Sequence, residues 1–298
     1  MKLCLGTVQF GMDYGISQAG QPAVADAIDI LECAVNNGVL ALDTAAAYGT
    51  AEDVIGVFLK QNSGYRSKIE LISKLPSVIL DNKPKQLHSQ IIHESLLRSL
   101  ERLGVDYLDA YLFHNPQHIY DDNLINIMMN FKNEGLVKQI GASVYTPDEA
   151  KKGIENKLDI LQIPYSIFDQ RMNEQNVLNM AQCNGVNLHT RSVFTQGLML
   201  MEDTDIPPHL EAARKIVRDY KEFCAKNEVT RVELAIAFIS RQKSITHLVF
   251  GVDSKEHLLE IIESNKKPIP DKILNDAEIQ FAKLDEDIIM PNRWNKSR

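Results

Sequence analysis

The sequence predicts an α/β protein folded as a (β/α)8 barrel of the TIM type, with eight parallel strands. Short apolar runs alternate with amphipathic segments along nearly the whole chain, as expected for successive βα units. The 298 residues suit eight such units with modest insertions. The competing fold, a doubly wound open sheet that binds a dinucleotide, would need a GxGxxG turn after a strand, and the sequence has none.

Apolar and β-branched runs mark the predicted strands in chain order. We place strands at 3–9, 39–42, 69–74, 107–114, 137–144, 158–165, 186–193 and 246–252. A loop marked by glycine and proline at 13–22 separates the first strand from the first helix. Because each later strand follows a helical segment, neighbouring strands should run parallel.

Apolar residues at three- and four-residue spacing mark the helices between these strands. We expect them at 23–37, 51–60, 86–103, 122–133, 173–183 and 255–264, and from Pro147 with Thr146 as its N-cap. Gly38, Gly104 and Gly135 end three of them. Two consecutive helices, 210–226 and 232–241, precede the last strand, and a helix at 271–283 and a polar tail at 290–298 follow the barrel.

The composition and the net charge disfavour several classes of protein. A net charge of −8 and a pI near 5.5 disfavour a protein that binds nucleic acid or an anionic membrane. No apolar run approaches the roughly 20 residues that span a bilayer, and the N-terminal apolar stretch is too short for a signal peptide. The four cysteines lack CxxC spacing. We therefore expect one reduced, cytoplasmic domain over residues 1–298, as a monomer or small homo-oligomer.

Three successive predicted strands end in residues with reactive side chains. Asp43 follows the strand at 39–42, Lys74 ends the next, and His114 ends the one after, while Tyr48 lies in a loop of small residues beyond Asp43. Each residue alone has an ordinary explanation in capping, loop packing or surface exposure. Because the carboxyl ends of barrel strands meet at one rim, their joint placement predicts an active site there.

These four side chains suit carbonyl reduction. The Lys74 ammonium should lower the pKa of the Tyr48 phenol, Asp43 should keep Lys74 charged, and His114 should orient a carbonyl oxygen. The hydride must come from a nicotinamide, because no side chain can supply one. A cofactor-binding barrel that acts as a sensor or partner subunit is the alternative. A metal-dependent hydrolase or isomerase is disfavoured, because the histidines show no metal-ligand spacing.

The chain resembles the aldo-keto reductase superfamily, particularly its bacterial members, over essentially its whole length. The resemblance rests on the motifs at 6–11, 43–49, 73–74, 114, 135–143, 162–166 and 191–198. It implies a (β/α)8 barrel that interconverts small carbonyl compounds and alcohols with NADP(H). It also implies a catalytic tetrad, with Tyr48 as acid and base, Lys74 and Asp43 tuning it, and His114 orienting the substrate.

The resemblance also assigns residues to the cofactor. They are Thr7, Val8, Asp43, Ser143, Gln162, Arg191, Ser192, Phe194, Gln196, Gly197, Gly251, Asp253, His257 and Glu260. Ser143 and Gln162 match positions that bind the carboxamide, although Val144 stands where the family usually has asparagine. Arg191 matches the position that packs on the nicotinamide face.

Two features of this resemblance concern specificity. After the last strand the family often places Lys or Arg against the 2′-phosphate of NADP, whereas this chain offers only Lys255 and His257 beside acidic residues, so NAD(H) competes. Tyr14, Phe168, Phe194 and Trp294 are candidate walls of the substrate pocket. The motifs at the first strand and at Arg191 point weakly to a sugar-like carbonyl.

Overall fold

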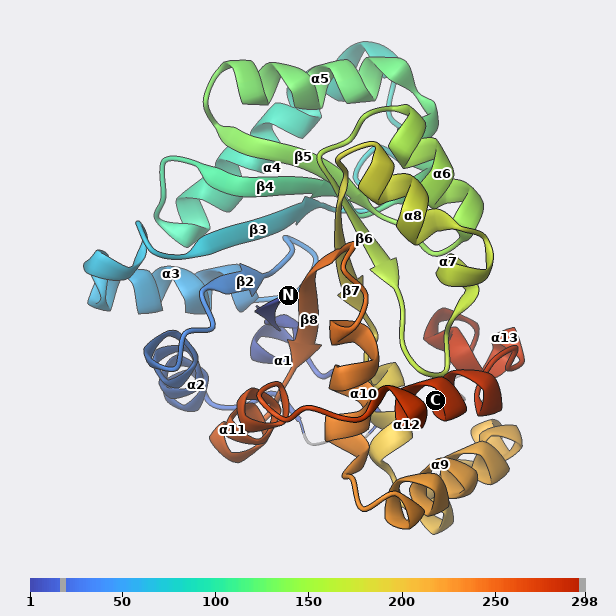
Figure 1. Ribbon diagram of the computed structural model, residues 1–298. Helices are drawn as coiled ribbons and strands as arrows, with labels where there is room; N and C mark the ends of the chain where they lie inside the picture. The colour runs from blue at the N-terminus through green and yellow to red at the C-terminus, as the bar shows by residue number, and fades with distance from the viewer. Residues whose placement is uncertain (17–19, 295–298) are drawn as a thin grey trace.

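Eight parallel strands close into a barrel in chain order in the computed structural model, which describes residues 1–16 and 20–294 (Figure 1). The strands are β1 (Lys2–Gly6), β2 (Ala41–Asp43), β3 (Glu70–Leu75), β4 (Leu108–Phe113), β5 (Val137–Ser143), β6 (Ile160–Pro164), β7 (Asn187–Arg191) and β8 (Ile245–Gly251). β1 pairs with both β2 and β8, which closes the cylinder. The predicted fold class is confirmed.

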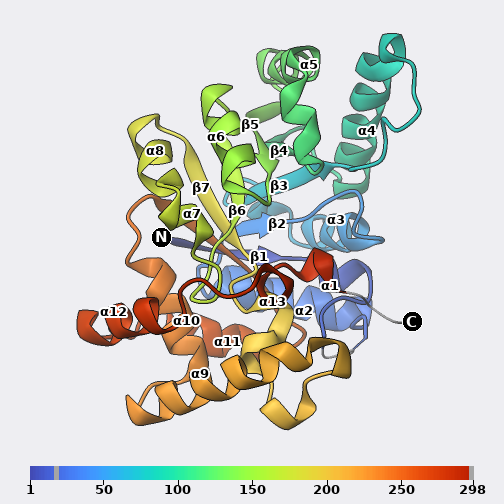
Figure 2. The same ribbon diagram turned by 90° about the vertical axis from the view of Figure 1, so that its right-hand side faces the viewer.

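Helices surround this barrel on its outside. They are α1 (Val8–Gly11), α2 (Val24–Asn36), α3 (Ala51–Gln61), α4 (His88–Leu103), α5 (Asp122–Asn133), α6 (Pro147–Glu155), α7 (Arg171–Glu174), α8 (Val177–Cys183), α9 (Arg214–Lys226), α10 (Arg231–Ser240), α11 (Lys255–Ser264), α12 (Asp271–Gln280) and α13 (Glu286–Ile289). Figures 1 and 2 both place α9, α10, α11 and α12 together on one side of the barrel. No helix in the described ranges is long and apolar enough to cross a membrane.

Several helices end or begin at the capping residues that the sequence predicted. Thr146 caps α6 in a capping box with Glu149, as its sequence suggested. Gly104 follows α4 with φ +66°, a left-handed conformation that glycine adopts without steric cost. The pair of helices before the last strand is also present, as α9 and α10.

Other predicted boundaries were wrong. The first strand ends at Gly6, and the next residues turn into α1, where a Cβ on Gly11 would lie 1.8 Å from the carbonyl oxygen of Tyr48. This close approach packs α1 under the loop that carries Tyr48. The predicted helix 173–183 is interrupted at Asn176, which has φ +60°.

The C-terminal half differs in two further places. The helix expected from residue 210 becomes α-helical only at Arg214, after a 3₁₀ segment kinked at Leu210. The helix expected to run to 283 ends at Gln280. Residues 17–19 of the predicted loop and 295–298 of the predicted tail lie outside the described residues.

Side chains that point into the barrel form layers along its axis. An apolar layer joins residues from β1, β2, β3, β4, β6 and β8: Cys4, Ala41, Ile72, Ala110, Leu112, Ile160 and Val249. Because side chains alternate along a strand, residues two positions further on face the same interior. These residues include Asp43 beyond Ala41, Lys74 beyond Ile72 and Gln162 beyond Ile160. The apolar layer therefore lies directly beneath these polar side chains inside the barrel.

The same alternation places a second polar layer at the opposite end of the barrel. Glu70 and His247 precede the apolar layer on β3 and β8, and His189 on β7 lies opposite His247 in the strand register. The two histidine rings lie 4.1 Å apart between centroids, and the Nε2 of His247 lies 3.0 Å from a Glu70 carboxylate oxygen. His189 is buried, and its Nδ1 has no hydrogen-bond partner among the described residues.

Acid should therefore destabilise the fold from about pH 6.5 downward. Burial, and then the neighbouring His247, hold the pKa of His189 well below its ordinary value. The unfolded chain takes up this proton first, so stability is lost as pH falls through the unfolded value. One such histidine costs about 1.4 kcal/mol between about pH 7.5 and about pH 5.5. Urea midpoints at the two pH values measure the loss.

A substitution isolates the contribution of His189. His189→Gln should reduce the change in midpoint, whereas His209→Gln, at an exposed position, should leave it unaltered. An unchanged pH dependence in His189→Gln would contradict the assignment. Below about pH 4.5 a further loss is expected, because the hydrogen bond with His247, despite opposing desolvation, lowers the pKa of Glu70 to about 2.

Candidate active site at the barrel mouth

A cavity of about 1060 Å³ opens at the carboxyl ends of the strands. Residues at or just beyond the ends of seven strands line it: Gly6, Asp43, His114, Ser143, Pro164, Arg191 and Gly251. This is the rim at which barrel enzymes hold their active sites. The volume lies just above the roughly 300–1,000 Å³ that ligand pockets occupy, so there is room for more than one small molecule.

The four side chains predicted to meet at this rim do so. The Lys74 ammonium is fully buried and lies 2.7 Å from a carboxylate oxygen of Asp43, 2.9 Å from the carbonyl oxygen of Thr44 and 3.4 Å from the Tyr48 hydroxyl. The rings of Tyr48 and His114 meet edge to face, 5.7 Å apart between centroids. Tyr48 and His114 line the cavity, whereas Lys74 lies beneath Tyr48 and does not.

The buried ion pair keeps Lys74 charged. Burial opposes the ammonium, but the Asp43 carboxylate and the Tyr48 hydroxyl outweigh it and raise the pKa of Lys74 above its usual value. The second carboxylate oxygen of Asp43 accepts a hydrogen bond of 2.8 Å from the Gln162 amide. Asp43 therefore anchors both Lys74 and Gln162.

The pKa of Tyr48 differs from the prediction. The Lys74 charge does lower the pKa of Tyr48, but desolvation is the larger effect and leaves it above its ordinary value. The phenol is therefore protonated at neutral pH and can act as a proton donor. The sequence-based expectation considered the effect of the Lys74 charge before any cost of desolvation was subtracted, and that cost is the larger of the two effects.

His114 is neutral at physiological pH. Burial, and then the charges on Lys74 and Arg191, lower its pKa to about 3. A neutral imidazole carries one ring N–H, which can donate to an oxygen in the cavity. The Nδ1 of His114 is buried and has no hydrogen-bond partner within residues 1–16 and 20–294.

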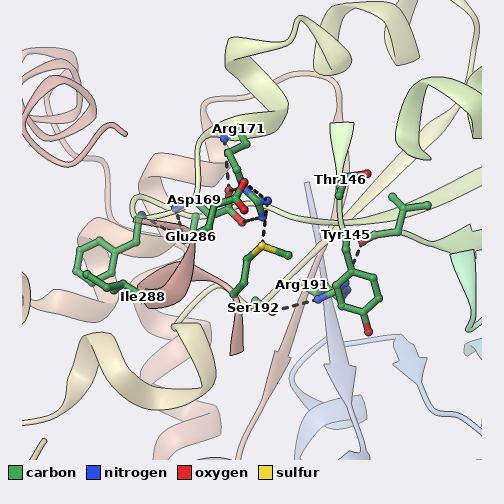
Figure 3. Close-up of polar contacts among 12 residues, drawn as sticks. Tyr145, Thr146, Asp169, Arg171, Arg191, Ser192, Glu286 and Ile288 are labelled. Atoms are coloured by element: carbon green, nitrogen blue, oxygen red, sulfur yellow. Dashed lines mark hydrogen bonds and ion pairs between the residues drawn. The ribbon is translucent and has the colours of Figure 1, made fainter. Parts of the chain in front are cut away.

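Arg191 organises the wall beside this cluster. Its guanidinium donates to the Ser143 hydroxyl at 3.3 Å and to the Val144 carbonyl oxygen at 2.9 Å, and it lies 4.4 Å from the centroid of the Tyr145 ring. Figure 3 shows Arg191 contacting Ser192 with the Tyr145 ring beside it. Sequence reasoning missed Tyr145, although its position just beyond β5 could have suggested it.

The segment after β7 forms another wall through the 3₁₀ helix η4 (Thr195–Leu200). Thr195 and Gln196 have φ values of +49° and +55°, which non-glycine residues seldom adopt. The Gln196 amide donates to the Tyr14 hydroxyl at 3.1 Å, so the loops after β1 and β7 touch. The Oε1 of Gln196 is buried without a partner in the described part of the chain, which leaves an acceptor free for a ligand.

Three of the four predicted pocket walls line the cavity, namely Tyr14, Phe194 and Trp294. Phe168 was predicted wrongly. It is buried against Tyr220 and Phe281, in the core around α9 and α12, and does not reach the cavity.

The C-terminal segment reaches the cavity through a contact that sequence reasoning missed. Arg171 lines the cavity and pairs with Asp169 at 2.7 Å and with Glu286 of α13 at 3.5 Å. Its guanidinium also lies 3.3 Å from the sulfur of Met290, another lining residue. Figure 3 shows Arg171 beside Asp169 and Glu286. These contacts tie the chain around α13 to the loop after β6.

The lining suits a nicotinamide dinucleotide. All fourteen residues predicted to contact the cofactor line this single cavity, from Thr7 and Val8 at the first strand to Glu260 in α11. Ser143 and Gln162 supply polar groups for a carboxamide, and the η4 backbone and the unpaired Gln196 oxygen supply more along the wall. Gly251 leaves space that a Cβ would occupy, 2.7 Å from a Gln9 side-chain oxygen.

Comparisons with known proteins match most of this chain to one family. The model of the aldo/keto reductase family matches residues 2–279. The chain is 28% identical over 265 residues to an NADH-specific methylglyoxal reductase of Escherichia coli, an alignment that covers 78% of this chain and 80% of that protein. It is 28% identical over 179 residues to a glyoxal reductase of Bacillus subtilis, covering 59% of this chain and 60% of that one.

A solved structure extends the similarity to the fold. The aldo-keto reductase AKR11C1 from Bacillus halodurans, in its holo form, superposes with a TM-score of 0.77 at 21% identity. The superposition covers 98% of this chain and 95% of that one.

Proposed function

The chain belongs to the aldo/keto reductase family, and on that premise we propose that it reduces a small carbonyl compound to an alcohol with a reduced nicotinamide cofactor. The observation that carries this proposal is the contact of Tyr48 with the buried Lys74–Asp43 pair at the wall of a cavity large enough for a dinucleotide. When bound, the cofactor supplies the hydride that no side chain can give.

Tyr48 acts as the proton donor in this proposal. As the carbonyl carbon gains the hydride, the C=O π electrons move onto the oxygen, and the Tyr48 hydroxyl gives that oxygen its proton. The phenolate left on Tyr48 is stabilised by the Lys74 ammonium, whose Nζ lies 3.4 Å away. Asp43 keeps that ammonium charged in a site from which water is excluded.

His114 orients the substrate. Because its pKa is about 3, it is a neutral donor rather than an acid, and its ring lies beside that of Tyr48. A carbonyl oxygen that accepts from both groups is held near the phenol proton. Gln162, Ser143 and Arg191 line the same cavity and would hold the carboxamide and the face of a bound nicotinamide.

Small aldehydes and dicarbonyls are the substrate class that we propose. The names of two relatives, a methylglyoxal reductase and a glyoxal reductase, support this class, and a sugar-like aldehyde fits the same chemistry. Tyr14, Trp294 and Met290 add apolar surface to the cavity wall, so the polar contacts of the substrate should be made mainly by its carbonyl.

A panel of aldehydes with NADH and NADPH tests the function. We expect oxidation of the reduced cofactor that depends on methylglyoxal, on glyoxal or on a short aldose, with an alcohol as the product. Binding of either dinucleotide without turnover of any aldehyde would contradict the enzymatic proposal. It would favour the alternative of a catalytically weak barrel that serves as a sensor or partner subunit.

A further inference from the structure

The far end of the cavity carries an unusual set of charges for a protein expected to use NADP(H). From the last residue of β8 onward the wall is formed by Gly251, Val252 and Asp253, and then by His257, Glu260 and Ile261 from α11. Asp253 and Glu260 are the only acids of this segment in the wall. If the nicotinamide lies at Tyr48, this end receives the adenosine.

The only lysine or arginine between residues 251 and 261 is turned away from this wall. The Lys255 ammonium lies 2.8 Å from a carboxylate oxygen of Asp29 on α2, and Lys255 is absent from the cavity lining. The remaining basic residues of the wall are Arg171, Arg191 and Arg231, which come from other elements. Of these, Arg171 and Arg231 already pair with Asp169 and Glu202.

His257 holds Asp253 in place. Its Nδ1 lies 2.6 Å from Oδ1 of Asp253, across one turn at the start of α11. The other carboxylate oxygen has no hydrogen bond to another residue in the described ranges. A carboxylate oxygen is an acceptor only, so it can receive the O–H of a ribose hydroxyl but no group that lacks a proton to give.

A 2′-phosphate and a 2′-hydroxyl place opposite demands on this site. The phosphate carries close to two negative charges at neutral pH and needs charge-assisted donors such as Arg or Lys. The free hydroxyl of NADH is a neutral donor, and a carboxylate is the group that dinucleotide-binding proteins use to receive it.

We propose that Asp253, fixed by His257, accepts a hydrogen bond from the 2′-hydroxyl of the adenosine ribose and so selects NADH over NADPH. This inference rests on the proposed function, because it assumes that a nicotinamide dinucleotide fills the cavity. It reverses the NADP(H) preference that the family resemblance implied.

Quenching of protein fluorescence by the two dinucleotides tests this selection without measuring turnover. Trp294, the only tryptophan of the chain, lies in the cavity wall and provides the signal. The wild-type protein should bind NADH at least about tenfold more tightly than NADPH, because the partly buried Asp253 carboxylate and a phosphate repel each other. In Asp253→Ala the ratio should fall towards one, through weaker NADH binding and stronger NADPH binding.

A neighbouring acid supplies the matched control. Glu256 is exposed in the first turn of α11 and does not line the cavity, so Glu256→Ala should keep the wild-type ratio. Equal or tighter binding of NADPH by the wild type, or an unchanged ratio in Asp253→Ala, would overturn the selection and leave the proposed function standing. Failure of both dinucleotides to bind would overturn the two together.

Discussion

Replacing Tyr48 by phenylalanine should abolish aldehyde reduction and leave cofactor binding intact. The substitution removes one hydroxyl and keeps the ring that packs against His114. With no proton donor aimed at the carbonyl oxygen, kcat should fall about 10²–10⁴-fold, the range that general acid catalysis contributes. The free energy of unfolding should change by about 1 kcal/mol or less, because the lost contact is a single long hydrogen bond of 3.4 Å.

A distant tyrosine controls for loss of a phenol hydroxyl in general. Tyr120 is exposed and lies outside the cavity lining, so Tyr120→Phe should retain full kcat. The comparison requires steady-state rates and dinucleotide titrations on the same preparations. Turnover by Tyr48→Phe at a rate near that of the wild type would remove Tyr48 from the role of proton donor.

Breaking the Lys74–Asp43 pair should cost both stability and activity. Asp43→Asn leaves the Lys74 ammonium, which is fully buried, without its carboxylate. Removal of one partner from a buried pair typically destabilises a protein by about 3–5 kcal/mol. The amine should also lose its proton more readily, which withdraws the charge that stabilises a phenolate on Tyr48. We expect a loss of kcat comparable to that in Tyr48→Phe.

A double variant separates the loss of stability from the loss of activity. Asp43→Asn with Lys74→Met removes both charges, so it should be more stable than either single variant and still inactive. The surface pair of the exposed Lys215 with Asp219 on α9 is the control, and its disruption should change stability by about 1 kcal/mol or less. Chemical denaturation and kcat measurements on the four proteins test this cycle. Additive losses of stability would contradict the coupling of Lys74 with Asp43.

The sequence was sufficient to predict the barrel and the meeting of its reactive residues. Strand alternation and parallel order bring the ends of β2, β3 and β4 to one rim, whatever the details of packing. Asp43, Lys74 and His114 could therefore be placed together from their positions at strand ends. Their catalytic roles stay predictions until the variants are measured.

What the sequence could not supply depends on three-dimensional surroundings. The pKa of Tyr48 is set by desolvation, which becomes visible only once the cavity wall is built. Phe168 is apolar and close to β6, but its neighbours Tyr220 and Phe281 come from α9 and the end of α12 and draw it into the core. The contact of Arg171 with Glu286 joins residues more than a hundred positions apart, and no periodicity encodes such a pair.

Transfer of an isotopic label tests hydride transfer most directly. The wild-type protein is incubated with an aldehyde and a reduced nicotinamide that carries deuterium at the transferable position, and the alcohol is analysed by mass spectrometry. We predict one deuterium on the former carbonyl carbon, and almost no labelled alcohol with Tyr48→Phe. Bound cofactor with no labelled alcohol from the wild type, for every aldehyde of the panel, would contradict the assignment of this cavity as a carbonyl reductase site.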